Sequence, residues 1–302
     1  MKNKLPNFLI VGAAKCGTTS LHNYLNQHPE IFMPSFNKEG KNIKEPQFFV
    51  KERVMKRIHS GVWEWNNYKN LFKEAESQKA IGEASVFYLY YFEDAIQNIK
   101  TYLNDNIKII IILRNPVERA YSAYKHVSRS LKETLSFENA LDLENKRLEN
   151  DKTLTPMIRY KDMGLYYKMV NAYLKSFDHV HVVLYDDFAN NPNDELKKIY
   201  QFLNVNESID VDYSTHYNVG SMEWKNQRVK SLMLNTSWLK DIAHRYFSKN
   251  LITRLRDIII FLAKRRVVKM KKSTRANLLS FYQDDIHKLS NLIKRDLSLW
   301  LQ

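Results

Sequence analysis

NFLIVGAAKCGTTS, residues 7–20, is the stretch that decides the fold of this chain. Phe8 to Val11 form an apolar run that predicts a buried strand. The small residues that follow, from Gly12 to Thr19, predict a tight turn that opens a helix containing Leu21 and Leu25. Backbone N–H groups at a helix N-terminus bind anions, and small residues let the backbone wrap around a phosphate. The stretch therefore predicts a phosphate-binding loop between a strand and a helix.

The position of the lysine in this loop separates it from the loops of ATPases. The common nucleotide motif is G-x-x-x-x-G-K-[ST]. Gly12, Gly17 and Thr19 fit that spacing, but Thr18 occupies the lysine position and the lysine comes earlier, as Lys15. The cation that would hold a triphosphate is thus missing. An ATP-dependent small-molecule or sugar kinase with a degenerate loop is one alternative, and it is disfavoured for this reason.

A second anion site is predicted around Arg114. Residues 107–113 (IKIIIIL) form an apolar run typical of a central strand buried on both faces. The run ends at Arg114-Asn115-Pro116, and Pro116 suits the first turn of a helix. Arg114 then lies at the carboxyl end of a strand, where open α/β sheets bind ligands, and Ser122 follows two helical turns later. The alternative is a surface arginine that caps the helix and an exposed serine.

Together these motifs resemble one enzyme family. The lysine-first loop K-x-G-T-T-S-L, the strand followed by Arg-Asn-Pro and Ser122, and the segment Lys44-Glu-Pro-Gln-Phe-Phe49 resemble the PAPS-dependent sulfotransferases. PAPS is 3′-phosphoadenosine 5′-phosphosulfate. The chain resembles the heparan sulfate N- and 3-O-sulfotransferase branch and looks like a bacterial member of it.

The resemblance implies a donor site. It implies that the 5′-phosphosulfate is held by the first loop, and that Lys15 also neutralises charge on the leaving oxygen; the loop residues are Lys15, Cys16, Gly17, Thr18, Thr19 and Ser20. Arg114 and Ser122 would hold the 3′-phosphate. Lys272 and Arg275 are weaker candidates for a late loop that closes on this phosphate, since the family's Lys-Gly-Arg signature is absent. For Cys16 we expect a small filler rather than a reactive thiol.

The resemblance also implies an acceptor site. Glu45 matches the glutamate that serves as general base in the relatives, and a carboxylate can take the proton that an acceptor hydroxyl or amine loses. Lys44 and Gln47 flank it and are candidate acceptor-binding residues. Glu83 is another candidate and the next choice for the base. The following residue departs from the family, because Ala84 stands where a lysine is usual, and this casts doubt on a heparan-like acceptor.

Fold class follows from the order of the expected elements. We expect an α/β fold, a P-loop-like parallel sheet flanked by helices on both faces, with a helical C-terminal region. The expected strands are 7–12, 79–83, 107–113 and 180–185, with a short one at 31–33 or 46–50. The 302 residues, 44% of them hydrophobic, suit a single sulfotransferase domain over 1–302.

Composition limits the remaining chemistry. One cysteine excludes an internal disulfide and fits a reducing compartment. The Cys and His residues lack metal-ligand spacing, so no metal site is predicted. A sulfuryl group has less negative charge than a phosphoryl group, and we expect transfer without Mg²⁺. An apolar signal core and a membrane anchor are not evident in the sequence, so a cytoplasmic enzyme is expected.

The basic charge is concentrated late in the chain. Residues 224–275 hold 15 Lys and Arg against two Asp, a local charge of +13 in a chain of net charge +14. Within 251–268, apolar residues follow helical spacing over a run too short to span a bilayer. This segment could contact the cytoplasmic membrane face, bind an anionic glycan, or be a solvated helix packed on the core. Nucleic-acid binding is not expected, because no recognition motif accompanies the charge.

The sequence thus predicts sulfuryl transfer from PAPS to an acceptor hydroxyl or amine. The acceptor is expected to be a carbohydrate, a glycolipid or a small molecule. The other alternative is a non-catalytic protein that binds membranes or polyanions, which predicts loss of Lys15, Glu45, Arg114 and Ser122; all four are present. The oligomeric state is not predicted.

Overall fold

A parallel five-stranded sheet forms the centre of the molecule, in the strand order β2-β3-β1-β4-β5. The computed structural model describes residues 4–35, 43–129, 133–213, 222–224, 264–266 and 270–302. The strands of the sheet are β1 (Phe8–Gly12), β2 (Ile31–Phe32), β3 (Ala80–Ala84), β4 (Lys108–Leu113) and β5 (Val180–Leu184). A separate antiparallel pair joins β6 (Met222–Trp224) to β7 (Lys264–Arg266). The sheet confirms the expected fold class.

Burial follows strand position. All five residues of β1 and all of β4 after Lys108 are buried, as expected for strands covered on both faces. The edge strand β5 is only half-buried over its first three residues. β1 pairs with β3 on one side and β4 on the other, so the phosphate-loop strand is central.

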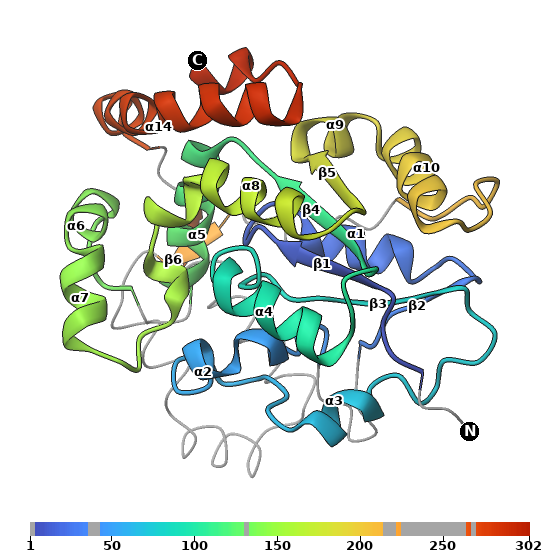
Figure 1. The fold of residues 1–302 in the computed structure, drawn as a ribbon. Coiled ribbons are helices and arrows are strands. Elements are labelled where there is room, and N and C mark those ends of the chain that lie inside the picture. The colour runs from blue at the N-terminus through green and yellow to red at the C-terminus, as the bar shows by residue number, and fades with distance from the viewer. Residues whose placement is uncertain (1–3, 36–42, 130–132, 214–221, 225–263, 267–269) are drawn as a thin grey trace, which may run out of the picture.

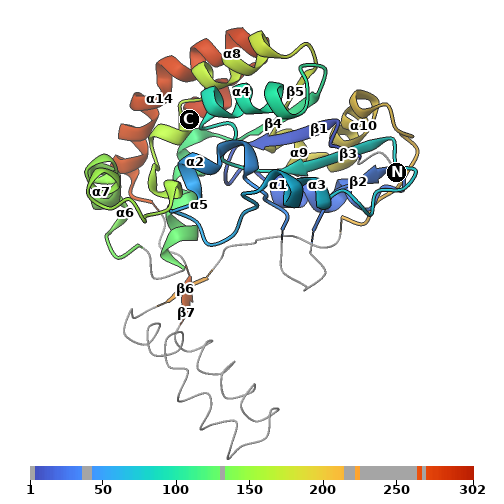
Figure 2. The ribbon, with the colours of Figure 1, turned by 60° about the horizontal axis from the view of Figure 1, so that its bottom comes forward.

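Helices cover both faces of the sheet (Figures 1 and 2). α4 and α8 lie together on one face, with α14 packed against α8, while α1 and α10 lie on the other. The α-helices are α1 (Thr18–Leu25), α2 (Lys51–Val54), α3 (Trp65–Asn70), α4 (Phe92–Tyr102), α5 (Pro116–Ser128), α6 (Phe137–Asp142), α7 (Glu144–Asn150), α8 (Tyr166–Ser176), α9 (Tyr185–Asn190), α10 (Pro192–Leu203) and α14 (Lys272–Ile293). Short 3₁₀ helices are η1 (Phe48–Val50), η2 (Pro156–Ile158), η3 (Asp162–Gly164) and η4 (Ser298–Leu301).

The strand order creates a crevice between β1 and β4. The chain leaves β1 towards β2 and leaves β4 towards β5, so the two connections diverge. Ligands of open α/β sheets bind where the connections diverge, outside the carboxyl ends of the strands. The loops that contain Lys15 and Arg114 therefore face each other across this crevice.

The C-terminal region holds the loop after β4 in place. The Asn115 side chain caps α5 by accepting from Val117 N at 3.0 Å, and its Nδ2 donates to the carbonyl of Trp300 at 3.1 Å. The Trp300 indole donates to Asp186 at 2.9 Å. Residues at the end of the chain thus help to fix the residue next to Arg114.

The structure decides between the two positions expected for the short strand, and it describes only a small part of the basic segment 251–268. Of the two candidates for the short strand, 31–33 is β2, whereas Phe48–Val50 form a 3₁₀ helix. Most of the basic segment 251–268 lies outside the described residues. Its residues 264–266 pair with β6 as β7, so a helix over that part is wrong because these residues form backbone bonds to another strand.

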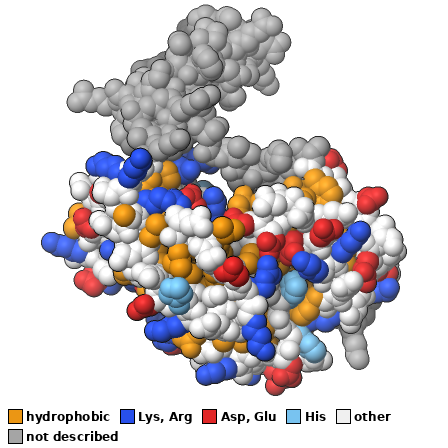
Figure 3. All heavy atoms as spheres, turned by 90° about the horizontal axis from the view of Figure 1, so that it is seen from above, with side chains coloured by type: hydrophobic (Ala, Val, Ile, Leu, Met, Phe, Trp, Pro, Cys, Tyr) orange, Lys and Arg blue, Asp and Glu red, His pale blue; other side chains and the backbone are white. Residues whose placement is uncertain are grey.

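The described residues contain no helix long and apolar enough to cross a membrane. The face seen from above α14 mixes acidic and basic side chains (Figure 3). The expectation of membrane contact, which rests on 251–268, stays a prediction.

Candidate active site

A cavity of about 550 Å³ opens at the carboxyl ends of the central strands. Its size is in the range of ligand-binding pockets. It gathers residues that are far apart in the sequence but were predicted to share one site. Its lining includes Lys15, Gly17, Thr18, Thr19, Ser20, Lys44, Glu45, Gln47, Arg114 and Ser122.

The loop after β1 forms one wall of the cavity. Lys15 has a φ of +71°, a left-handed conformation that is uncommon for a residue with a side chain. Gly17 caps α1 with a φ of +96°, and a Cβ there would lie 2.8 Å from the Tyr185 ring. Glycine is thus required where the loop passes under Tyr185. Thr18, Thr19 and Ser20, the first residues of α1, line the cavity. The first N–H groups of a helix have no acceptor within the helix and favour an anion.

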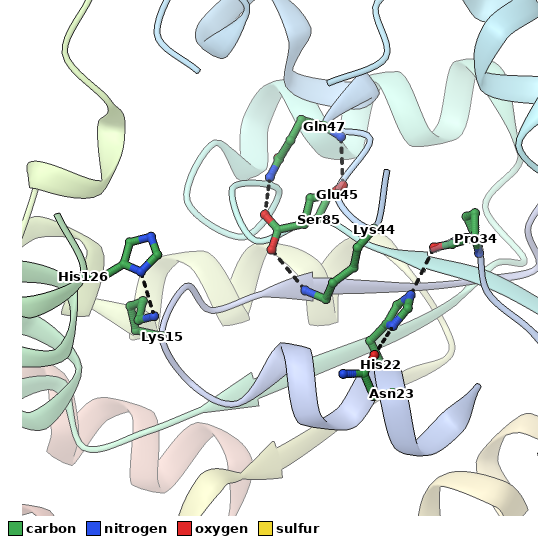
Figure 4. A network of polar contacts seen from close by, with 9 residues as sticks. All are labelled: Lys15, His22, Asn23, Pro34, Lys44, Glu45, Gln47, Ser85 and His126. Atoms are coloured by element: carbon green, nitrogen blue, oxygen red, sulfur yellow. Dashed lines mark hydrogen bonds and ion pairs between the residues drawn. The ribbon is translucent and has the colours of Figure 1, made fainter. Parts of the chain in front are cut away.

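Lys15 contacts a histidine from α5 (Figure 4). Its Nζ lies 3.4 Å from Nδ1 of His126. Burial, and then the charges of Lys15 and Arg129, lower the pKa of His126 to about 4, so the ring is neutral at pH 7. A neutral Nδ1 accepts a hydrogen bond from the ammonium group, which assigns the ring proton to Nε2. Burial, and then Arg129, lower the pKa of Lys15 to about 8, so Lys15 is mainly cationic at pH 7.

Arg114 and Ser122 reach the cavity from consecutive elements, the end of β4 and α5. Arg114 follows β4 directly, and its guanidinium lies over the ring of Tyr185, 4.7 Å from the centroid. This cation–π contact holds the guanidinium at the cavity wall. Ser122 comes from α5 and also lines the cavity. The two residues that were predicted to hold one phosphate thus line the same cavity, and their binding of an anion stays a prediction.

Glu45 is held by its two neighbours in the sequence motif. Lys44 Nζ lies 3.0 Å from Glu45 Oε1, and Gln47 Nε2 donates to Oε2 at 3.0 Å. Gln47 has a φ of +55°, and its backbone N–H donates to Ser85 Oγ at 2.9 Å. Backbone strain of this kind is common at functional sites. Both carboxylate oxygens are oriented, and the side chain stays about one-third exposed to the cavity.

Glu83 and Cys16, by contrast, are not brought to the cavity. Glu83 is fully buried and accepts from the Tyr68 hydroxyl at 3.4 Å, and burial raises its pKa to about 8. The expected contact of Glu83 with an acceptor does not fit this position. The Cys16 thiol is fully buried and lies 3.6 Å from the Tyr166 hydroxyl, where burial raises its pKa. That position fits a filler, and any bond from Cys16 to the donor would have to come from its backbone.

Lys272 and Arg275 also lie away from the cavity lining. Arg275 forms an ion pair with Glu118 at 2.6 Å and donates to a main-chain oxygen of Gln302. Lys272 is exposed at the start of α14. The position of these residues gives no support to their assignment to the donor site.

Several lining residues escaped the sequence analysis, and His126 and Tyr185 are the two that contact predicted site residues. His126 lies four residues after Ser122, so the two share a face of α5, and this spacing is a signal that sequence reasoning can use. Tyr185 follows β5 directly, as Arg114 follows β4. An aromatic residue at a strand's carboxyl end is too common to be singled out by sequence alone.

The described part of the chain holds no group of three or more His, Cys, Asp or Glu residues that could bind a metal ion. The expectation of a metal-independent reaction stays a prediction.

Comparison with known proteins decides the family. The model of the "Sulfotransferase domain" family matches residues 5–253. The chain belongs to the sulfotransferase domain family. Within it, a crystal structure of a sulfotransferase from Alicyclobacillus acidocaldarius shares 30% identity and a TM-score of 0.73, covering 99% of this chain and 100% of that one.

Curated sulfotransferases also match. The chain is 28% identical to carbohydrate sulfotransferase 15 of Homo sapiens over 67% of its own length and 44% of the relative's. It is 25% identical to membrane-associated sulfotransferase kil1 of Dictyostelium discoideum, over 76% of its own length and 62% of the relative's. The chain thus spans about half the length of these curated relatives.

Proposed function

We propose that this sulfotransferase moves a sulfuryl group from PAPS to a hydroxyl or amine of a carbohydrate or glycolipid acceptor. The observation that supports it most is the single cavity that gathers Lys15, Glu45, Arg114 and Ser122. Lys15 and Arg114 are two separate cations, and they suit a donor with phosphate groups at the 3′ and 5′ positions of its ribose. The carboxylate of Glu45 lines the same cavity.

The proposed donor contacts follow the two anion sites. The N-terminus of α1 and Lys15 hold the 5′-phosphosulfate, and Arg114 with Ser122 holds the 3′-phosphate. Phosphate contacts of this kind are charge-assisted hydrogen bonds, worth about 1.5–3 kcal/mol each. The 3′-phosphate contacts would distinguish PAPS from ATP.

The proposed reaction places Glu45 as the general base. The acceptor oxygen or nitrogen attacks sulfur as Glu45 takes its proton. The bond between sulfur and the bridging phosphate oxygen breaks, and 3′-phosphoadenosine 5′-phosphate (PAP) leaves. Lys15 offsets the charge that grows on the bridging oxygen, a form of electrostatic stabilisation that acts mainly in the transition state.

The acceptor class rests on relatives. The human relative is named a carbohydrate sulfotransferase, and we carry that class over as part of the proposal.

A transfer assay with ³⁵S-labelled PAPS tests the proposed function. Extract fractions enriched in polysaccharides, lipids and small molecules are incubated with the protein and with its Lys15→Ala variant. The expected result is a labelled product in a carbohydrate-containing fraction with the wild type alone. Labelled product at equal rates with both proteins, or in none of the fractions, would contradict the proposal.

A further inference from the structure

The two proposed anion sites lie on separate loops that leave neighbouring strands. Lys15 follows β1 and Arg114 follows β4, and both residues line the cavity. Among the described residues, the last main-chain bond between the two loops runs from Ala13 N to the Ile112 carbonyl, at 2.7 Å. Beyond this bond, side-chain contacts have to set the distance between the two cations.

The Tyr166 hydroxyl contacts both of these loops. Its oxygen lies 3.1 Å from the Arg114 carbonyl and 3.6 Å from the thiol of Cys16, the residue after Lys15. A carbonyl only accepts, so the hydroxyl donates to Arg114 and its oxygen can accept from the thiol. The other contact of the thiol, to the Ala14 carbonyl, is longer, at 3.8 Å. Burial raises the pKa of both Tyr166 and Cys16, which keeps both protons in place at neutral pH.

Tyr166 is itself held by the C-terminal region. It is the first residue of α8, and its side chain is fully buried. Its backbone N–H donates to the Asp285 carboxylate at 2.7 Å, and the Tyr167 N–H donates to the same carboxylate at 3.2 Å. Asp285 belongs to α14, which packs against α8 (Figure 1). The Trp300 ring lies edge-on to the Tyr166 ring, with centroids 6.3 Å apart. The hydroxyl therefore has a fixed position from which it can hold both loops.

Each cation is thus fixed by its side chain and through its loop. The Arg114 guanidinium lies over Tyr185, and its carbonyl accepts from Tyr166. The Lys15 ammonium contacts His126, and the next residue contacts Tyr166. A ligand that engages both cations gains most from such a site, because the two loops need no ordering when it binds. A ligand that engages one cation gains little from a fixed distance between them.

Resting on the proposed function, we infer that Tyr166 is a positioning residue that sets the distance between the 5′- and 3′-phosphate sites. It does so without lining the cavity. Loss of its hydroxyl would leave the side chains of both phosphate sites in place. The loops would then have to be ordered when a nucleotide with both phosphates binds. Tyr166 thereby favours a two-phosphate nucleotide over either monophosphate.

Calorimetric titration of the wild type and Tyr166→Phe with PAP, 5′-AMP and 3′-AMP tests the inference. PAP has both phosphates, whereas each monophosphate has one of them. Tyr166→Phe is expected to weaken PAP binding about tenfold, as for loss of one buried hydrogen bond, and to weaken either monophosphate by less than about twofold.

Tyr173→Phe is the matched control for the loss of a buried hydroxyl. Tyr173 is also fully buried on α8, and its hydroxyl donates to the Tyr88 carbonyl at 2.9 Å. That carbonyl belongs to neither phosphate loop. Tyr173→Phe should therefore lose stability in urea unfolding, as Tyr166→Phe does, but keep the wild-type ratio of PAP affinity to monophosphate affinity.

Cys16→Ala breaks the same bridge from the loop after β1. It is expected to weaken PAP binding by a smaller factor, roughly threefold, because a thiol is a weak donor. In the Tyr166→Phe background it should leave the ratio of PAP to 5′-AMP affinity unchanged, since both substitutions break one bridge. If Tyr166→Phe does not fold, Cys16→Ala alone decides, and a wild-type ratio in that variant would overturn the inference.

The outcomes separate the inference from the proposed function. Equal loss of affinity for all three ligands in Tyr166→Phe would show a general structural role and overturn the inference. Equal loss for PAP and only one monophosphate, or wild-type affinity for PAP, would also overturn it. In these cases a wild-type preference for PAP leaves the proposed function standing. A wild type without that preference would contradict the proposed PAPS donor, and the inference falls with it.

Discussion

Nζ of Lys15 lies 3.4 Å from Nδ1 of His126, and the low pKa of this histidine makes it a neutral hydrogen-bond acceptor for the lysine. The contact joins the loop after β1 to α5, two elements about 110 residues apart in sequence. It fixes the direction of the one flexible side chain that we propose acts on the leaving group. A lysine has four rotatable side-chain bonds, so this orientation matters for the rate.

We therefore expect His126→Ala to lower kcat roughly tenfold to a hundredfold, as for loss of a hydrogen bond to a charged group. PAP affinity should change much less. His126→Asn, which can offer an acceptor near the place of Nδ1, should restore part of the rate. A variant that lost kcat and PAP affinity in equal measure would show that His126 binds the donor rather than positions Lys15.

The pKa of Lys15 predicts an alkaline limit to activity. Burial lowers this pKa to about 8, so the cation is present below pH 8 and is lost as the pH rises further. kcat/KM for PAPS reports the free enzyme, and we expect it to fall about tenfold per pH unit above 8. Lys15→Arg should move this limb to higher pH, because arginine stays protonated. An unchanged alkaline limb in Lys15→Arg would assign the titration to another group.

Glu45→Gln tests the proposed base. The amide keeps the shape of the side chain but cannot take a proton, so kcat is expected to fall by roughly 10²- to 10⁴-fold. PAP affinity should stay near that of the wild type. Glu52→Gln, an exposed glutamate on α2, is the matched control and should retain full activity. Wild-type turnover by Glu45→Gln on the true acceptor would place the base elsewhere.

Glu83 predicts a stability effect rather than a catalytic one. Its folded pKa of about 8 exceeds its ordinary value of 4.5, so the folded state keeps a proton that the unfolded state releases. Stability from this group is complete below pH 4.5 and is lost as the pH rises towards 8, at up to about 1.4 kcal/mol per pH unit. Glu83→Gln, an uncharged amide of similar shape, should flatten this profile in urea unfolding measured between pH 5 and 8. Equal slopes for the two proteins would mean that Glu83 is ionised in the folded state.

Local sequence was sufficient for much of the fold. The buried runs in β1 and β4, the glycine turn before α1 and the proline at the start of α5 each determine local structure through neighbouring residues alone. The segment 46–50 was ambiguous because its paired phenylalanines suit either a strand or a buried turn. The left-handed Gln47 and its bond to Ser85 favour the 3₁₀ helix, and that bond depends on tertiary contact.

The candidate site was predicted in part for the same reason. Lys15, Glu45, Arg114 and Ser122 lie in motifs with a fixed spacing, and the sheet brings them to one cavity. Burial of the Glu83 carboxyl and the cation–π contact of Arg114 with Tyr185 arise from packing between distant segments. Such contacts leave no local pattern in the sequence.

Calorimetric titration with PAP and with AMP tests the central claim most directly, since the two ligands differ in the 3′-phosphate. We predict that PAP binds at least tenfold more tightly than AMP, because contacts to that phosphate are worth about 1.5–3 kcal/mol each. Arg114→Ala should remove most of this difference, while Arg53→Ala, which breaks a surface ion pair with Asp94, should retain it. Equal affinity of the wild type for PAP and AMP would contradict the assignment of the cavity to a PAPS donor.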